Sequence, residues 1–181
     1  MSLYYFDDLE GDGLARETSH PFFVQHATAD FYYDGGDDFA PFGNDTGSDL
    51  LRNIEEWYRE RRAGDKSVTW LRNLIKAWGF DTAYLDCVEQ GQIEAIKYTE
   101  HYSSSNEVLD QAVIATVFGQ FKIAGKADKE IYNMATNAFR RQRHLANLAK
   151  EETQWNLYDE YVAKLNIMEA DLAEMANKKA R

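Results

Sequence analysis

The 181-residue sequence predicts a mainly α-helical protein, a bundle of five to six helices. Several segments between Ser48 and Asn177 repeat apolar residues at spacings of three and four, the period of an amphipathic helix. The chain has only two prolines, and no Pro-rich or Ser/Gly-rich linker divides it. Its length and 44% hydrophobic composition suit one buried core. We therefore expect a single domain over 1–181, in which residues 1–47 pack on a helical core of residues 48–177.

The N-terminal quarter combines acidic and aromatic residues. Residues 1–49 contain eleven of the 31 acidic residues but only one base, Arg16, so nearly all of the net charge of −11 lies there. Tyrosines and phenylalanines are also concentrated in this segment, whereas disordered segments contain few aromatic residues. We expect an ordered, loop-rich segment, with short strands at Phe22-Phe23-Val24 and Phe31-Tyr32-Tyr33.

The first predicted helix spans residues 47–62, where one apolar stripe contains Leu50, Leu51, Ile54, Trp57 and Tyr58. Its N-terminus can be capped by Asn44, Asp45, Thr46 or Ser48. A second helix is predicted from Ser67, as N-cap, to Trp78, with Gly79 ending it. The short connection between the two helices predicts an antiparallel pair.

Helical periodicity continues through the rest of the chain. Residues 82–102 have a helical composition interrupted by Gly91, so one broken helix and two short helices are both possible, and the serines at 103–105 end that region. Residues 107–124 are apolar on nearly all sides, which places that helix at the centre of the bundle. Gly125 is expected to end this helix, and Asp128 can cap the next one. No Gly or Pro lies between Asp128 and Arg181, so one continuous helix and two helices are both possible. Because a helix of about fifty residues would project from a domain of this size, we expect a break near Lys150 and a last helix ending about Asn177.

Composition also predicts the cellular setting. A strongly acidic protein repels nucleic acid and anionic membranes, and no apolar stretch approaches the roughly 20 residues of a membrane span. The single cysteine, Cys87, cannot form an internal disulfide, and the N-terminus does not resemble a signal peptide. We expect a cytoplasmic protein that binds neither nucleic acid nor membranes.

The sequence contains no recognised catalytic signature, so we predict no catalytic residue and no cofactor. Nucleophile-elbow, phosphate-loop and zinc-protease motifs are all absent. His20 and His26 lie among the N-terminal acids, but their spacing matches no ligand motif, and we predict no metal site. Residues 8–13 resemble the start of a calcium loop, yet the twelfth position, which needs a bidentate acid, is Ser19. The basic run 140–144 is expected on a solvated helix face, paired with Glu151 and Glu152.

Residues 34–47 form the most distinctive string, rich in aspartate and glycine. One interpretation is a tight turn that caps the first helix, and another is a site whose acids serve as general acid/base groups or as ligands of a hard cation. The two are compatible, because a capped, rigid loop is also a good binding surface. Acids beside aromatic residues are typical of an interface for a basic partner protein. The predicted partner-binding residues are Asp30, Tyr32, Tyr33, Asp34, Asp37, Asp38, Phe42, Asn44, Asp45 and Asp49.

Four strings resemble the bacterial YfeS-like family over roughly residues 20–60: His20-Pro21, residues 31–34, residues 37–49 and Trp57-Tyr58. This resemblance implies a bacterial, cytoplasmic protein, and it transfers no activity and no catalytic residue. Residues 42–46 are also similar to a string in small acidic bacterial proteins of toxin-immunity systems. Our leading hypothesis is a non-catalytic, immunity-like interaction module that binds a basic partner. The alternatives are a metal-dependent enzyme built on the 34–49 segment with His20 or His26, and a small-ligand binder between helices.

Overall fold

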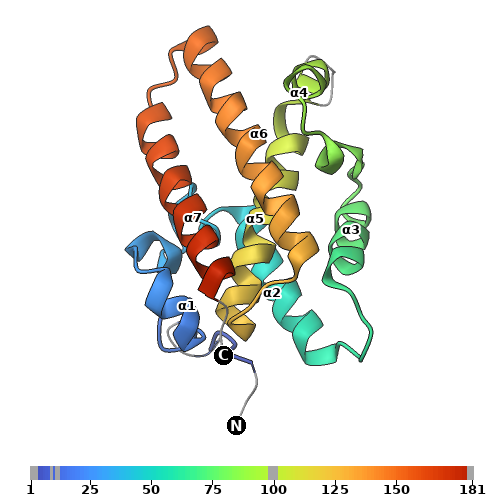
Figure 1. Cartoon of the computed structure of the whole chain (residues 1–181), viewed down its shortest axis with the longest axis vertical. Helices are drawn as coiled ribbons and strands as arrows, with labels where there is room; N and C mark the ends of the chain where they lie inside the picture. The colour runs from blue at the N-terminus through green and yellow to red at the C-terminus, as the bar shows by residue number, and fades with distance from the viewer. Residues whose placement is uncertain (1–3, 9, 11–12, 98–101, 179–181) are drawn as a thin grey trace.

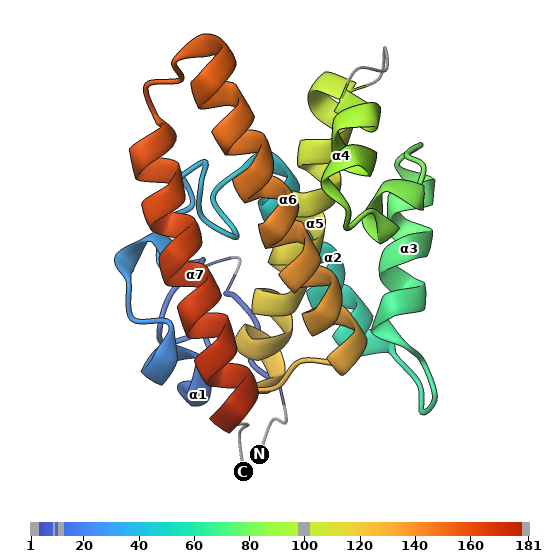
Figure 2. The same cartoon turned by 45° about the horizontal axis from the view of Figure 1, so that its top comes forward.

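The computed structural model describes residues 4–8, 10, 13–97 and 102–178. For residues 95–97 and 102–105 it describes the backbone alone. The described residues form seven α-helices and two short 3-10 helices, with no strand among them, which confirms the mainly α fold class. Figures 1 and 2 show α5, Tyr102–Ala124, running through the middle of the bundle. Within this part of the chain, no helix is both long and apolar enough to span a membrane.

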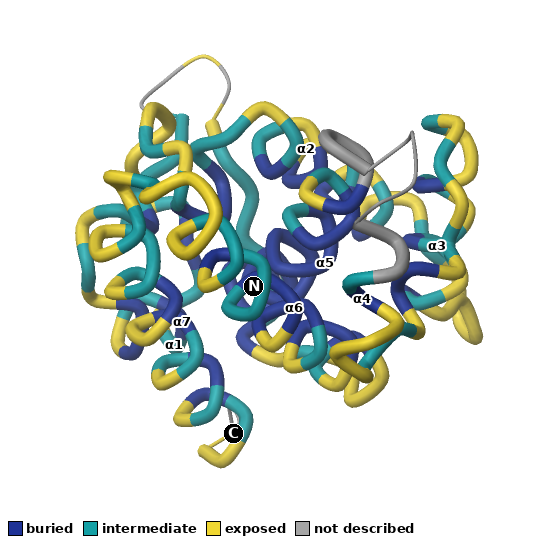
Figure 3. The backbone as a smooth tube through the Cα atoms, turned by 90° about the horizontal axis from the view of Figure 1, so that it is seen from above, coloured by how far each residue is buried: buried dark blue, intermediate teal, exposed yellow. Residues whose placement is uncertain are grey.

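Three long helices surround α5. They are α2, Asp45–Glu60; α6, Lys129–Thr153; and α7, Tyr158–Lys178. From residue 109 to residue 123 every side chain of α5 is buried or half-buried, as predicted for a central helix, and the dark tube of Figure 3 follows this stretch. Because α2 and α6 pack directly on α5, the apolar stripes of both helices face it.

The shorter elements cover the sides of the bundle. They are α1, Pro21–His26; η1, Asp30–Tyr33; α3, Ser67–Ala77; η2, Ala83–Asp86; and α4, Gln90–Lys97. The chain turns back after α2, so α3 runs in the opposite direction, as predicted (Figure 1). However, α3 also contacts α5 and α6, and the ring centroids of Trp57 and Trp70 lie 5.7 Å apart at its contact with α2.

Both predicted N-terminal strands are wrong. Phe22-Phe23-Val24 lie in α1, where Pro21 is the first residue and the His20 Nδ1 accepts the Phe22 N–H at 3.1 Å. Phe31-Tyr32-Tyr33 lie in the 3-10 helix η1. A proline at the first helical position and a capping side chain favour a helical turn in α1, and the described residues contain no strand with which either run could pair. Local capping therefore outweighs the strand preference of the aromatic residues.

The predicted helix boundaries hold within a few residues. Ser67, the predicted N-cap of α3, is instead the first residue of this helix. Its hydroxyl donates to the carboxylate of Asp128, which lies in the connection between α5 and α6. Of the two arrangements left open for residues 82–102, the part described up to residue 97 forms two short elements, η2 and α4, with Gly91 in the first turn of α4. The serines at 103–105 do not end that region but lie inside α5. The last break occurs at Gln154, whose φ of 52° ends α6 four residues beyond Lys150.

Candidate functional site

The acidic loop, residues 34–44, has its shape fixed by its own side chains. The Asp34 Oδ1 accepts the Gly36 N–H at 2.8 Å, and the Asp37 Oδ1 accepts the Phe39 N–H at 3.0 Å. Asn44 caps α2 through the Gly47 N–H at 2.7 Å, and its amide also donates to the Ala40 carbonyl at 3.0 Å. Asx turns and a helix cap thus hold the backbone, which confirms the predicted capped turn.

Two glycines allow the loop to fold tightly on itself. A Cβ atom at Gly43 would lie 2.1 Å from the Asp37 carbonyl oxygen, and one at Gly47 would lie 2.0 Å from the Pro41 carbonyl oxygen. Only glycine permits these approaches, since real Cβ atoms do not come so close to backbone atoms. The loop is therefore a compact unit in which residues 34, 37 and 43 are neighbours.

Contacts with α7 fix the loop against the bundle. The Lys164 ammonium lies 2.6 Å from the Asp37 Oδ2, and both side chains are mostly buried. Just before the loop, the Tyr32 hydroxyl donates to the Asp171 carboxylate at 2.8 Å. A partly buried ion pair with short geometry is stronger than a surface pair, so these anchors limit movement of the loop.

Half of the predicted partner-binding residues support the loop from within. Tyr32 and Phe42 belong to the hydrophobic core, with 0% and 2% of their surface exposed, so they cannot contact a partner. Asp37 is paired with Lys164, and Asn44 is the cap of α2. Tyr33 is half-buried beneath the Arg16 guanidinium, whose carbon lies 4.2 Å from the ring centroid.

The other half are exposed carboxylates. These are Asp30, Asp34, Asp38, Asp45 and Asp49. Asp30 pairs with Arg16 at 2.7 Å, and Asp49 lies 3.8 Å from Arg52. For Asp34, Asp38 and Asp45, the described residues supply no basic partner. Three carboxylates of the predicted set therefore lack a basic partner among the described residues: Asp34 and Asp38 on the acidic loop, and Asp45 at the first position of α2.

A cavity of about 280 Å³ opens beside the acidic loop, which we call the aromatic cavity. It lies between α5, α6 and the turn before α7, and its walls include Phe39, Asn106, Glu107, Gln142, Trp155 and Tyr161. A smaller hollow shares Phe39, Glu107, Gln142 and Tyr161 with it and is also lined by Asp38 and Asn44. The exposed Asp38 of the loop is therefore next to the cavity.

Three aromatic rings form one wall of the aromatic cavity. The centroids of Phe39 and Tyr161 are 4.9 Å apart, those of Trp155 and Tyr161 are 5.4 Å apart, and those of Phe39 and Trp155 are 6.0 Å apart. The faces of such rings carry negative partial charge and attract cations. One cation of the chain itself already uses this wall, because the Lys164 Nζ lies 5.4 Å from the Phe39 centroid.

Two adjacent residues of α5 make the opposite wall polar. Burial raises the pKa of the Glu107 carboxyl above its ordinary value of 4.5, and the negative charge of Asp38 raises it further. Asn106 has 5% of its surface exposed, and its Nδ2 has no hydrogen-bond partner among the described residues. A buried donor without a partner costs free energy, so this shielded amide is an unsatisfied group beside the cavity.

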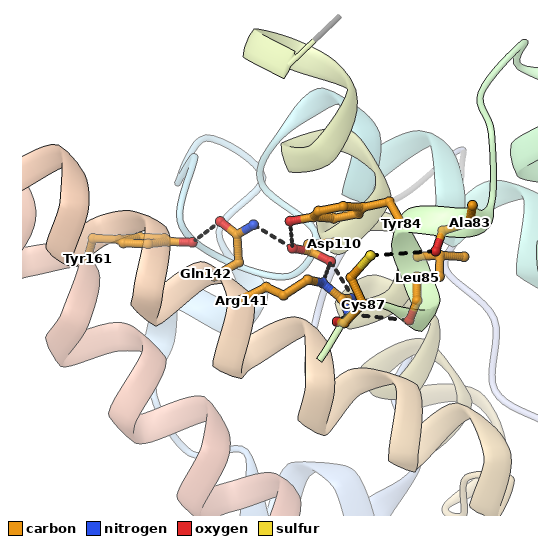
Figure 4. A network of polar contacts seen from close by, with 8 residues as sticks. All are labelled: Ala83, Tyr84, Leu85, Cys87, Asp110, Arg141, Gln142 and Tyr161. Carbon is orange, nitrogen blue, oxygen red and sulfur yellow. Dashed lines mark hydrogen bonds and ion pairs between the residues drawn. The ribbon is translucent and has the colours of Figure 1, made fainter. Parts of the chain in front are cut away.

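A buried polar network holds the Tyr161 wall in place (Figure 4). The Tyr161 hydroxyl donates to the Gln142 Oε1 at 2.8 Å, and the Gln142 Nε2 donates to the Asp110 Oδ2 at 2.7 Å. Asp110 in turn accepts hydrogen bonds from Arg141 at 2.8 and 3.1 Å. Burial raises the pKa of the Asp110 carboxyl, and the Arg141 guanidinium opposes that shift. The cavity wall is thus connected to the centre of the bundle.

The expected position of Arg141 on a solvated face is wrong. Both Arg141 and Asp110 are fully buried, and the guanidinium also donates to the carbonyls of Leu85 and Cys87 at 3.3 and 2.8 Å. Arg143 pairs with Glu169 of α7, not with Glu151 or Glu152. A buried charge needs this full set of partners, and they come from α5 and from η2 with the residue after it, so the pattern of α6 alone cannot reveal them.

Sequence reasoning missed the residues of the cavity. Asn106 and Glu107 stand at the expected start of a helix, and Trp155 lies in the turn that separates α6 from α7. One signal was available: Trp155 lies next to the predicted break, where a bulky aromatic residue needs a packing partner. Nothing in the sequence indicates that this partner is Phe39.

The histidines proposed as metal ligands have structural contacts. His20 caps α1, and the His26 Nδ1 lies 2.8 Å from the Phe22 carbonyl oxygen. Among the residues that the structure describes, no three His, Cys, Asp or Glu side chains converge as a metal site would require. The metal-dependent alternative therefore gains no support from these side chains.

Similarity to a bacterial protein extends over most of the chain. No protein-family model matches it, and no solved structure matches it. This helical bundle with an acidic loop is 32% identical over 149 residues to a protein of Escherichia coli strain K12 named Uncharacterized protein YfeS. The aligned part covers 82% of this chain and 59% of that relative. The chain is similar to this YfeS protein over less than two thirds of that protein's length, and the predicted resemblance to YfeS-like proteins is confirmed well beyond residues 20–60.

Proposed function

We propose that this protein is a cytoplasmic, non-catalytic interaction module whose acidic loop binds a basic partner protein. The observation that carries the proposal is that Asp34 and Asp38 on the acidic loop, and Asp45 at the start of α2, have no basic partner among the described residues. The loop that presents them is fixed by the Asp37–Lys164 ion pair and by the Asn44 cap. Fixed charges of one sign speed the association of an oppositely charged protein and select against others. The free thiol of Cys87 is in keeping with a reducing compartment.

An immunity-like role is one form of this proposal, in which the basic partner is a toxin. A rigid acidic surface suits this task, because preformed surfaces lose little conformational entropy on binding. The support is the geometry of the loop together with the charge concentrated in residues 1–49. Co-expression with the products of neighbouring genes, followed by co-purification, identifies such a partner.

Removing the three carboxylates that lack a basic partner should slow the association with the captured partner. Asp34→Asn/Asp38→Asn/Asp45→Asn should lower the association rate constant about tenfold or more at low salt, since electrostatic steering of this kind raises the rate by about 10–10³. The wild-type rate should fall steeply as salt increases, while that of the variant should change little. Surface plasmon resonance at several salt concentrations measures both effects.

The matched control is Glu56→Gln/Glu60→Gln/Glu130→Gln, which removes the same number of negative charges. These side chains are exposed, and two of them lie in the second half of α2, whose 16 residues extend about 24 Å from the capped end. The control should associate almost as fast as the wild type. An equal loss of rate in both variants would show that only net charge matters and would refute a specific acidic face.

A further inference from the structure

We infer that the aromatic cavity is a pocket for one arginine side chain of a basic polypeptide, and that this arginine anchors the partner bound by the acidic loop. The inference rests on the proposed function, because it names the group that the loop's partner inserts. It also concerns different residues: Asn106, Glu107, Phe39, Trp155 and Tyr161 line the cavity, and none of them belongs to the set predicted from sequence.

The charge around the cavity favours a cation. The carboxylates of Glu107 and Asp38 both make the electrostatic potential at the cavity more negative. Within the described part of the chain, neither carboxylate is paired with a base. Glu107 accepts a hydrogen bond from the neutral amide of Gln111, at 3.3 Å. A guanidinium between the two carboxylates relieves their mutual repulsion and makes charge-assisted hydrogen bonds.

The shape of the wall favours a planar cation. Phe39, Trp155 and Tyr161 present three touching rings, and a guanidinium stacks on aromatic faces better than a compact ammonium does. The cavity volume of about 280 Å³ lies at the lower end of ligand pockets, which are roughly 300–1,000 Å³. One side chain fits this space, whereas a large cofactor does not.

Asn106 indicates that the arginine belongs to a polypeptide. A guanidinium has only donors, so it leaves the unpaired Asn106 Nδ2 donor without an acceptor. This nitrogen is shielded from solvent in the free protein, so the main-chain carbonyl of an arginine residue supplies its acceptor only when the cavity wall adjusts on binding. Free arginine offers a carboxylate instead, which the negative charges of Asp38 and Glu107 repel.

The test is a titration of the full chain with N-acetyl-L-arginine amide at low salt, followed by isothermal titration calorimetry. The wild type should bind this probe, and Glu107→Gln should bind it about tenfold more weakly, because a hydrogen bond between charged groups becomes a bond to a neutral group. Glu56→Gln, an equal charge change on α2 outside the cavity, should leave the affinity unchanged. The neutral analogue N-acetyl-L-citrulline amide should not bind detectably.

Asn106→Leu separates a binding role from a structural one. If the Nδ2 lacks a partner in the free protein, this variant should be at least as thermally stable as the wild type while binding the probe several-fold more weakly. A large loss of stability with unchanged affinity would overturn the role given to Asn106. Tighter binding of free L-arginine than of the blocked amide would overturn the polypeptide source.

Different results would contradict the arginine pocket and the acidic loop. Probe binding that ignores Glu107→Gln, or equal binding of the citrulline analogue, would overturn the arginine pocket and leave the loop experiment unaffected. Conversely, the probe can bind in a way that depends on Glu107 while the partner associates equally fast with the wild type and with the Asp34→Asn/Asp38→Asn/Asp45→Asn variant. That result would refute the acidic loop as the partner site and leave the guanidinium pocket supported.

Discussion

Replacing Arg141 with methionine should lower the free energy of unfolding by about 3–5 kcal/mol, the usual cost of leaving a buried charge without its partner. Arg141 and Asp110 are both fully buried, and the guanidinium also satisfies two carbonyls near η2. Methionine fills much of the same volume, so the loss reflects mainly the stranded Asp110 carboxylate. Urea denaturation followed by circular dichroism measures the difference.

Two further variants test the origin of this loss. Arg143→Met removes a neighbouring cation of α6 whose partner, Glu169, is partly exposed, and it should cost no more than about 1 kcal/mol. Arg141→Met/Asp110→Leu removes both buried charges and should be clearly more stable than Arg141→Met alone. If the double variant is as unstable as the sum of the two single variants, the charge pair is not the cause.

The second large effect is expected at Gly43. Gly43→Ala places a methyl group 2.1 Å from the Asp37 carbonyl oxygen, so the acidic loop must open or the backbone must shift. We expect a loss of about 1–3 kcal/mol, the usual cost of forcing extra volume into a packed site. Because the loop loses its shape, the partner's association rate should fall as well. Thermal denaturation and binding kinetics measure the two consequences.

Gly35→Ala is the matched control, since Gly35 lies in the same loop and a methyl group there meets nothing within 4 Å. It should change the free energy of unfolding by no more than about 0.5 kcal/mol. Equal behaviour of the two variants would mean that the close approach at Gly43 does not determine the loop's shape.

The helical framework was predictable because its signals are local. The stripe that begins at Leu50 and the Asn44 cap both act within one helix, and both are found where the sequence places them. Gly125 ends α5 with a φ of +67°, as a stop signal should. Residues 31–33 were assigned to a strand because aromatic residues favour strands, but a strand needs a neighbour, and the fold supplies none there.

The site was predictable only in part. The acidic loop is visible as a string, but the burial of Tyr32 and Phe42 depends on α5 and α7, which follow much later in the chain. The aromatic cavity unites residues 39, 107, 155 and 161, and no periodicity relates them. Arg141 was misplaced for the same reason, since its partner Asp110 comes from another helix. Such contacts exist only after the helices have packed.

A ¹H–¹⁵N NMR titration with an arginine-containing basic peptide tests the central claim most directly, namely that the acidic loop and the aromatic cavity form one binding face. The account predicts that the largest shifts occur at residues 34–45, at Glu107 and at the indole N–H of Trp155. The indole signals of Trp57, Trp70 and Trp78, which lie outside this face, should hardly move. Shifts centred on those three tryptophans, or spread evenly over the surface, would contradict the account.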